Sequence, residues 1–359
     1  MHALAVSGGA VLIVSVLWDA FETIVLPHRV SRGFRLTRLF YVVTWRPFRA
    51  LGRRREAGNP RENFLSIFGP MSLLLLLAAW ALALVLGFAL LHWGFGTHLS
   101  MPRGLSDLGG DLYFSGTTLV TLGLGDVTPS TTSARVLSFV ESGMGFGFLA
   151  LVVGYLPTLF QAFSRREVTI ALLDARAGSP PTAAEFIRRH GGPTEGRSLA
   201  ELLHDWEVWS ADLLETTISF PVLAYYRSQH DNQSWLAGLT TVLDVCTLVI
   251  AGVEGGPVRS ARLTFAMARH ALVDISQVFR LKPGAPTEDR LPAADAVRLR
   301  ETLLQAGAPL KPGEAIDERL RNLRSMYEPF AFALSDHLLM PLPRWVPPVG
   351  ARDNWQTTA

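Results

Sequence analysis

The residues best suited to chemistry in this sequence lie in one short stretch, Thr121-Leu-Gly-Leu-Gly-Asp126. Gly123 and Gly125 stand at alternate positions, where they allow backbone dihedral angles of alternating sign that residues with a Cβ resist. Such a backbone turns successive carbonyl oxygens to one side. Four copies around an axis would form stacked rings of oxygens that replace the hydration shell of a cation. The stretch therefore predicts an ion-selectivity filter made of Thr121, Leu122, Gly123, Leu124, Gly125 and Asp126.

Long apolar segments flank this stretch and indicate an all-α membrane protein. Residues 3–26 and 64–93 are each long enough to cross a hydrocarbon layer, which needs about 20 residues, and 64–93 contains no Asp, Glu, Lys or Arg. We expect a third span at 136–163 and a short helix at 111–120 that re-enters the membrane before the filter. Non-helical backbone at membrane depth requires surrounding protein or a water-filled path. The filter therefore requires several subunits.

Residues 3–26 have two interpretations, a retained span and a secretory signal peptide. A signal peptide begins with basic residues and ends at small ones. This segment ends instead with Asp19, Glu22 and Pro27. We therefore expect a retained span, and we expect the two acids to pair with nearby arginines rather than face lipid.

A basic loop sets the expected orientation in the membrane. Residues 28–62 carry ten arginines and two glutamates, and short loops rich in Lys and Arg stay on the cytoplasmic side. The N-terminus is then outside and the C-terminal half cytoplasmic, in a cell (inner) membrane crossed several times. The expected domains are a first span (1–27), a basic cytoplasmic linker (28–63), a pore domain (64–164) and a cytoplasmic helical domain for regulation or assembly (165–359).

Within the basic loop, Arg29, Arg32, Arg35 and Arg38 recur at every third residue. One hypothesis is a voltage-sensing helix whose arginines move through the membrane field. The other is an interfacial helix whose apolar side chains, Trp45 among them, enter the headgroup region. A voltage sensor needs companion helices with acidic partners, and only one span precedes this array. We favour the interfacial helix.

The second half of the chain has the composition of a water-soluble helical domain. Residues 235–253 are apolar, but they contain Asp244 and lie in polar sequence, so we interpret them as a buried helix rather than a fourth span. The lone Cys246 excludes an internal disulfide. No metal-ligand spacing, phosphate-binding loop or nucleophile motif occurs, so we expect no enzyme. Helices are expected at 198–217, 233–253, 257–279, 291–306 and 314–339, after a linker at 178–181.

Residues 112–129, LYFSGTTLVTLGLGDVTP, resemble the pore helix, filter and outer mouth of the tetrameric potassium-channel superfamily in its one-pore-loop form. The resemblance covers this stretch and its two flanking spans, about a hundred residues, and does not extend into the cytoplasmic half. It implies that the carbonyls of Thr121, Leu122, Gly123 and Leu124 line the ion path. It also implies that Asp126 stands behind the outer end of the filter.

Four residues of the pore helix are the expected filter support: Tyr113, Phe114, Thr117 and Thr118. Two departures from the family pattern affect them. Leu124 and Phe114 stand where the family commonly has tyrosine and tryptophan, so an apolar contact is expected in place of a hydrogen bond, with a softer filter. Thr117 stands where some members carry a glutamate facing the filter acid, so no carboxyl pair is expected with Asp126.

Two residues of the last span are candidates for gating. Gly145 lies at the position where the family often has a hinge glycine, and close packing between helices explains it equally well. For Gly143, Gly147 and Gly154 we favour packing. Glu141 is a carboxylate inside a span, which by default indicates function. We expect it to face the pore helix or the upper cavity, either protonated or bonded to Thr117 or Thr118.

The expected function is passive potassium conduction by a homotetramer, with permeant K+ in the filter and no cofactor or other metal. Its partners are expected to be further copies of the chain and membrane lipid, with no nucleic acid and with an unnamed regulatory ligand for the C-terminal domain. Two alternatives stay open. One is a weakly selective cation channel with the same spans, and the other is a membrane-anchored signalling protein that no longer conducts.

Overall fold

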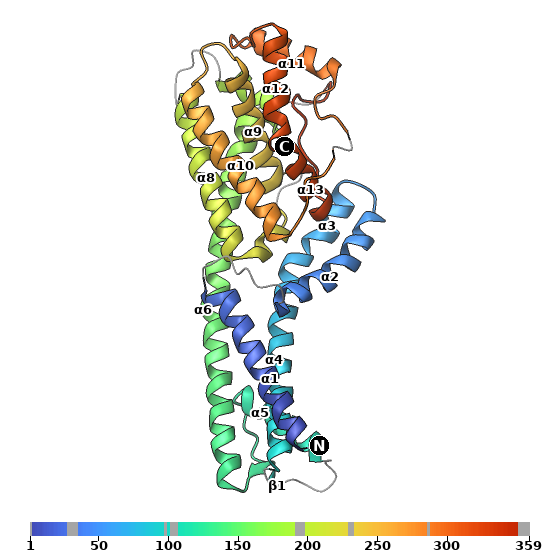
Figure 1. The fold of residues 1–359 in the computed structure, drawn as a ribbon, viewed down its shortest axis with the longest axis vertical. Helices are drawn as coiled ribbons and strands as arrows, with labels where there is room; N and C mark the ends of the chain where they lie inside the picture. Colours follow the sequence, from blue (N-terminus) through green and yellow to red (C-terminus); the bar gives the residue numbers. More distant parts are fainter. Residues whose placement is uncertain are drawn as a thin grey trace. The chain divides into compact units, whose positions relative to one another are not determined.

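The computed structural model describes residues 2–26, 35–96, 99–100, 107–190, 198–228, 233–285 and 288–350, and shows an all-α membrane protein (Figure 1). Three helical stretches are long and apolar enough to span a membrane, His2–Val25, Asn59–Phe95 and Thr132–Ala177. This confirms the three expected spans. Among the described residues, the strands are one two-residue pair, in which β1 (Leu99–Ser100) runs antiparallel to β2 (Thr128–Pro129).

Contacts divide the chain into two compact units, which we call the first and second units. The first unit contains Met1–Phe48 and Ile67–Phe160, and the second contains Arg49–Ser66 and Gln161–Ala359. The basic segment 28–63, expected as one linker, is thus shared between the two units. Its final part, including the helix α3 (Asn59–Ser66), belongs with the C-terminal half.

In the first unit, α1 (His2–Ala20) packs along α4 (Phe68–Phe95) (Figure 1). Glycines make this close approach possible. A Cβ on Gly9 would lie 2.6 Å from the carbonyl oxygen of Gly87, and a Cβ on Gly94 would lie 2.6 Å from the Val6 side chain. Small residues let membrane helices approach closely in this way. The first span is therefore a packed part of this unit.

The two acids at the end of the first span have different kinds of partner. A π-helical turn, η1 (Phe21–Val25), follows α1. The Asp19 carboxylate accepts from the backbone N–H of Thr37 at 3.0 Å and from the Trp80 indole at 3.1 Å. Glu22 lies 3.7 Å from the guanidinium of Arg35. The expected pairing with arginine holds for Glu22, whereas Asp19 binds neutral donors.

The arginine array is only partly described. Arg29 and Arg32 lie outside the described residues, Arg35 precedes α2 (Leu36–Arg53), and Arg38 lies in its first turn. The choice between sensor and interfacial helix thus stays a prediction. Trp45, expected to enter the headgroups, is instead buried, with its ring 4.7 Å from that of Phe68.

The last span is longer than expected. In place of 136–163, α6 runs from Thr132 to Ala177 and passes through Pro157. It ends where Gly178 takes a φ of +86°, a left-handed conformation typical of helix ends. The expected linker at 178–181 begins there. The basic residues Arg165 and Arg166 therefore lie within the helix, which continues past Pro157 although the proline removes one backbone hydrogen bond.

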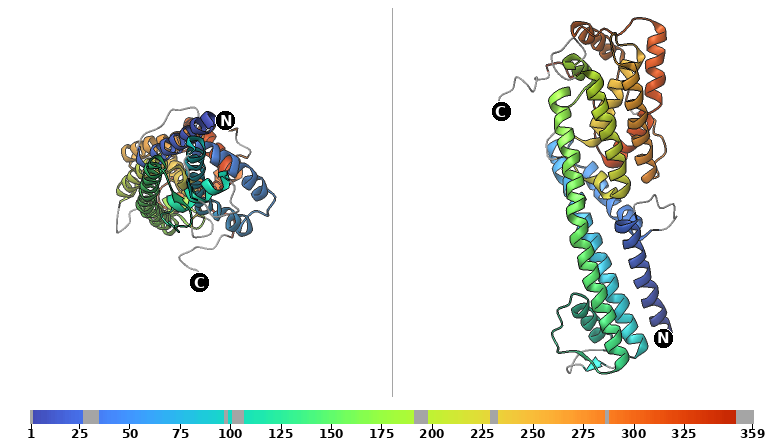
Figure 2. Two further views of the ribbon diagram at one scale, coloured as in Figure 1. Left: turned by 90° about the horizontal axis from the view of Figure 1, so that it is seen from below. Right: turned by 90° about the vertical axis from the view of Figure 1, so that its left-hand side faces the viewer.

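The second unit is a helical domain built around α9 (Trp235–Ala251), whose seventeen residues are all buried. α10 (Val258–Val278) packs against both α9 and α8 (Leu199–Ser219), as the views in Figure 2 show. This agrees with a buried helix rather than a fourth span. The other helical elements are α7 (Ala183–His190), η2 (Pro221–Tyr225), α11 (Ala293–Gln305), α12 (Glu314–Ser325) and α13 (Glu328–Leu338).

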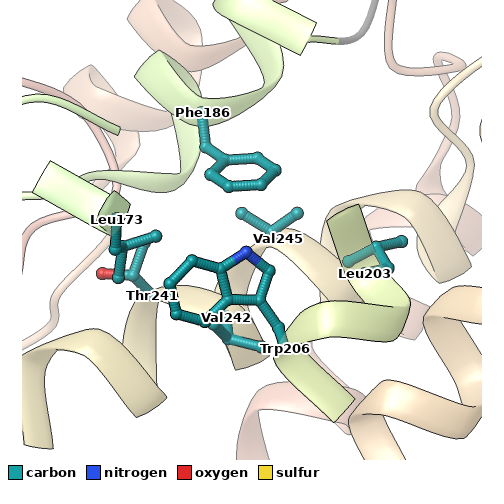
Figure 3. Close-up of a pocket in the computed structure, with 7 residues that line it drawn as sticks. All are labelled: Leu173, Phe186, Leu203, Trp206, Thr241, Val242 and Val245. Carbon is teal, nitrogen blue, oxygen red and sulfur yellow. The ribbon is translucent and has the colours of Figure 1, made fainter. Parts of the chain in front are cut away.

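Apolar side chains from four helices meet in this core and leave no space for a water molecule (Figure 3). The cluster contains Leu173, Phe186, Leu203, Trp206, Thr241, Val242 and Val245. It is therefore a packed core and has no room for a ligand.

The helix expected at 314–339 is two helices. α12 ends at Ser325, and α13 begins at Glu328 with Pro329 in its first turn. In a continuous helix the ring of Pro329 would clash with the carbonyl of Ser325, four residues before it. The proline therefore sets the break.

A buried ionic network joins α9 to Arg290, which precedes α11, and to the start of α13. Arg290 donates to both carboxylate oxygens of Asp244 and, at 3.1 Å, to Glu328, while the Tyr327 hydroxyl donates to Asp244 at 2.5 Å. Burial raises the pKa of Asp244 to about 6, and the hydrogen bonds from Arg290 limit that rise. The carboxylate is thus ionised at neutral pH and depends on Arg290.

We expect Arg290→Met to lower the free energy of unfolding by about 3–5 kcal/mol, because it leaves the Asp244 charge buried without its cation. Arg319→Met, an exposed arginine on α12, is the matched control and should change little. Chemical unfolding of the purified protein measures both. A loss below about 1 kcal/mol for Arg290→Met would show that Tyr327 alone satisfies the carboxylate.

Candidate functional site

The backbone of residues 121–125 alternates in conformation. φ is +57° at Thr121, +52° at Gly123 and +79° at Gly125, while Leu122 and Leu124 are not among the residues with positive φ. The two glycines take the left-handed conformation that their type allows. Thr121 takes it as well, which the sequence did not predict because a β-branched residue rarely does so.

The end of α5 (Asp107–Leu119) holds the start of this stretch through the backbone. The carbonyl of Thr117 accepts the N–H of Leu122 at 2.8 Å and that of Gly123 at 3.3 Å. The carbonyl of Thr118 accepts the N–H of Thr121 at 3.0 Å. Thr117 and Thr118 thus support the stretch with main-chain oxygens. The Thr117 hydroxyl donates to the carbonyl of Phe114 at 3.0 Å, within the helix.

A side-chain hydrogen bond holds the other end of the stretch. The Tyr113 hydroxyl donates to one carboxylate oxygen of Asp126 at 2.9 Å, and the other oxygen accepts the backbone N–H of Val127 at 3.0 Å. Phe114 is buried with its ring edge-on to that of His92, the centroids 5.2 Å apart. Of the two neighbouring aromatic residues, one therefore makes a polar contact and the other an apolar one.

Glu141 lies in a buried polar cluster that joins three helices. Its side chain has no exposed surface, and it accepts a short hydrogen bond from the Ser115 hydroxyl on α5. His92 on α4 lies 3.3 Å from its other oxygen, and Ser115 also contacts the carbonyl of Val85 at 2.8 Å. The expected hydrogen bond from Thr117 or Thr118 to Glu141 is not observed. The partner on α5 is Ser115, which lies two residues nearer the start of that helix, on the face toward α6.

The end of α5 rests directly on α6 at Gly145. A Cβ placed on Gly145 would overlap the carbonyl oxygen of Leu119 and lie 2.7 Å from its carbonyl carbon. Close packing therefore explains this glycine. By contrast, a Cβ on Gly143, Gly147 or Gly154 would have no neighbour within 4 Å among the described residues of one chain. Packing within one chain does not explain these three.

The described residues contain no cluster of three or more His, Cys, Asp or Glu that would hold a metal ion. The arrangement at 117–126 supplies instead main-chain oxygens, held at one end by α5 and at the other by Tyr113. Such a set can hold a dehydrated monovalent cation without side-chain ligands. In the single chain, Leu122 and Leu124 are 60% and 59% exposed.

Comparison with known proteins agrees with this geometry. Residues 73–162 match the model of a family described as "Ion channel". The matched range contains most of α4, all of α5, the stretch 121–126 and the first part of α6. The match supports ion-channel activity and points to transport rather than catalysis.

One relative is the uncharacterized membrane protein YdjJ of Bacillus subtilis. It is 22% identical over 257 residues, which cover 70% of this chain and 73% of the relative. The similarity is consistent with a membrane protein and does not indicate a substrate. No solved structure matches the chain.

The contact at Gly145 gives a direct test of packing against hinge bending. Gly145→Ala should destabilise the protein by about 3 kcal/mol, the upper part of the range for overpacked cores, because the end of α5 must move. Gly143→Ala and Gly147→Ala are matched controls, since a Cβ at either position would have no neighbour within 4 Å among the described residues. Chemical unfolding in detergent measures all three.

If Gly145 served only as a hinge, alanine would leave stability unchanged or raise it, because alanine favours the helix by about 1 kcal/mol over glycine. Equal stability of Gly145→Ala and the two controls would therefore contradict the packing role.

Proposed function

We propose that this protein conducts potassium ions passively across a membrane as a homotetramer. The observation that carries the proposal is the alternating backbone at Thr121, Gly123 and Gly125, delivered by the end of a short helix between two spans. Carbonyl oxygens of Thr121, Leu122, Gly123 and Leu124 would bind permeant K+ in successive rings. No cofactor takes part.

The tetramer follows from what one chain leaves uncovered. The non-helical stretch lies at membrane depth and needs protein around it. One strand supplies one quarter of each oxygen ring, so four copies close the path. Large apolar side chains of α6 are also exposed in a single chain, as lipid or neighbouring subunits would require: Val136, Phe139, Phe146, Leu149 and Val153.

The proposed orientation rests on charge. The arginine-rich segment 28–62 would lie on the cytoplasmic side, with the N-terminus outside and the second unit's C-terminal helices in the cytoplasm of a prokaryote-like cell. This places the mouth next to Asp126 on the outer side. Gating is assigned to the contacts of Glu141 and Gly145 with α5, because a movement of α6 there would reach the stretch 121–126 through Ser115 and Leu119.

A flux assay tests conduction. Gly123→Asp should abolish rubidium uptake into vesicles that contain the purified protein, because a carboxylate and a Cβ at φ of +52° disrupt the carbonyl rings. Gly96→Asp is the matched control: Gly96 also has a positive φ, +59°, and open space around a Cβ, but lies at the end of α4. The control should retain uptake.

No uptake in wild type would favour a non-conducting membrane-anchored protein and contradict the proposal. Uptake that is the same in wild type and Gly123→Asp would separate transport from this stretch. Equal permeability to sodium and potassium in the wild type would identify a weakly selective cation channel.

The hydrogen bond from Tyr113 predicts a second effect, on selectivity. Tyr113→Phe removes the donor to Asp126, so the filter should hold its rings less tightly and admit more sodium relative to potassium. Thr117→Val is the matched control, because it removes a hydroxyl of the same helix that bonds within the helix. Reversal potentials with sodium and potassium on opposite sides measure the ratio. An unchanged ratio in Tyr113→Phe would mean that this bond does not set selectivity.

A further inference from the structure

A cavity of about 860 Å³ lies within the second unit, apart from the filter. Small-molecule sites in proteins commonly occupy roughly 300–1,000 Å³. The walls come from α3, from the residues just before α9, and from the segment that follows α13. The segment 339–343 contributes Leu339, Met340, Pro341, Leu342 and Pro343, which form an apolar wall.

Basic residues predominate among the charged side chains of the cavity. Arg61, Arg227 and Arg344 line it with a single acid, Glu62. Arg227 is buried, and its Nη1 lies 3.2 Å from Glu62. Burial lowers the pKa of the Arg227 guanidinium, Glu62 counters this effect, and the nearby charge of Arg61 adds to it. One carboxylate therefore balances only part of the positive charge.

Several polar atoms of the lining have no hydrogen-bond partner among the described residues. They are Nε of Arg61, Nε of Arg227, the Ser228 hydroxyl and the side-chain amide oxygen of Gln233. Buried polar groups are normally satisfied, so four in one cavity require an explanation. The oxygen and nitrogen of a glutamine amide are interchangeable on rotation, so Gln233 can present a donor. These four atoms are themselves buried, so the cavity meets Arg61 and Arg227 through the other atoms of their side chains, together with the exposed side chain of Arg344.

We propose that this cavity binds a small organic phosphate, with the phosphate at the arginines and the organic part against the apolar wall. A phosphate has several acceptor oxygens and a negative charge, which suit guanidinium donors better than a cation or a neutral ligand would. The volume is too large for phosphate alone. Either a soluble phosphate monoester or the headgroup of a phospholipid has this chemistry.

The site would give the C-terminal domain a regulatory ligand. Arg61 and Glu62 belong to α3, which ends at Ser66, and the apolar helix α4 begins two residues later at Phe68. A ligand held at α3 therefore acts on the residues that begin the span before the filter. The inference concerns binding and does not depend on conduction.

Calorimetric titration of the full-length purified protein tests the proposal. The soluble probe is AMP, with adenosine as its uncharged counterpart, and the lipid probe is dioctanoyl phosphatidic acid, with dioctanoylglycerol as its counterpart. We expect saturable binding of one phosphate-bearing probe and none of its counterpart. AMP binding would identify a soluble ligand, and phosphatidic acid binding a lipid headgroup.

Variants connect the binding to this cavity. Arg61→Gln and Arg344→Gln should each weaken binding by about tenfold or more, because each removes a charge-assisted hydrogen bond. Arg344 is exposed, so its variant decides the test if Arg61→Gln fails to fold. Arg321→Gln, an exposed arginine of α12 outside the lining, should bind as wild type does. The proposal is wrong if neither phosphate-bearing probe binds, if the uncharged counterparts bind equally well, or if Arg344→Gln leaves the affinity unchanged.

Discussion

The contact between the carbonyl end of α5 and Gly145 is the constraint on which the first unit depends. Leu119 is the last residue of α5, and the non-helical stretch begins at once after it. Any side chain at position 145 would push Leu119 away and move Thr121 with it. The absence of one Cβ on α6 therefore sets where the non-helical stretch starts. The N–H groups of Leu122 and Gly123 donate to the carbonyl of Thr117 and so fix these two residues relative to α5.

A second contact with α6 restrains the rotation of α5. Ser115, one turn before Leu119, donates to Glu141, one turn before Gly145. The contact at Gly145 fixes the distance between α5 and α6, and the hydrogen bond from Ser115 to Glu141 fixes the rotation of α5 about its axis. α5 is therefore held at two points along the same face. His92 brings α4 into the same cluster. Because a buried carboxylate is costly without donors, each of the three helices stabilises the arrangement of the other two.

The sequence was sufficient for features that depend on residue type alone. The spans followed from runs of apolar residues, the positive φ at positions 123 and 125 from their being glycines, and the buried α9 from Asp244 in an apolar helix. Features that depend on tertiary contacts were not accessible. Ser115 and His92 are distant in sequence from Glu141, so their pairing could not be inferred, and nothing in the type of Thr121 predicts its positive φ.

In the second unit, too, the features that depend on tertiary contacts could not be predicted from residue type. Arg61 belongs to the arginine-rich segment 28–62, whereas Arg227 has no other Lys or Arg near it in the sequence, and only folding brings the two to one cavity. The domain boundary expected at 63/64 followed from composition, where polar sequence turns apolar. Composition reports which residues prefer lipid, whereas packing reports which residues contact one another. α3 is polar and continuous in sequence with α4, yet it packs with the C-terminal helices. By packing, α3 thus belongs to the second unit, although in sequence it leads directly into α4 of the first.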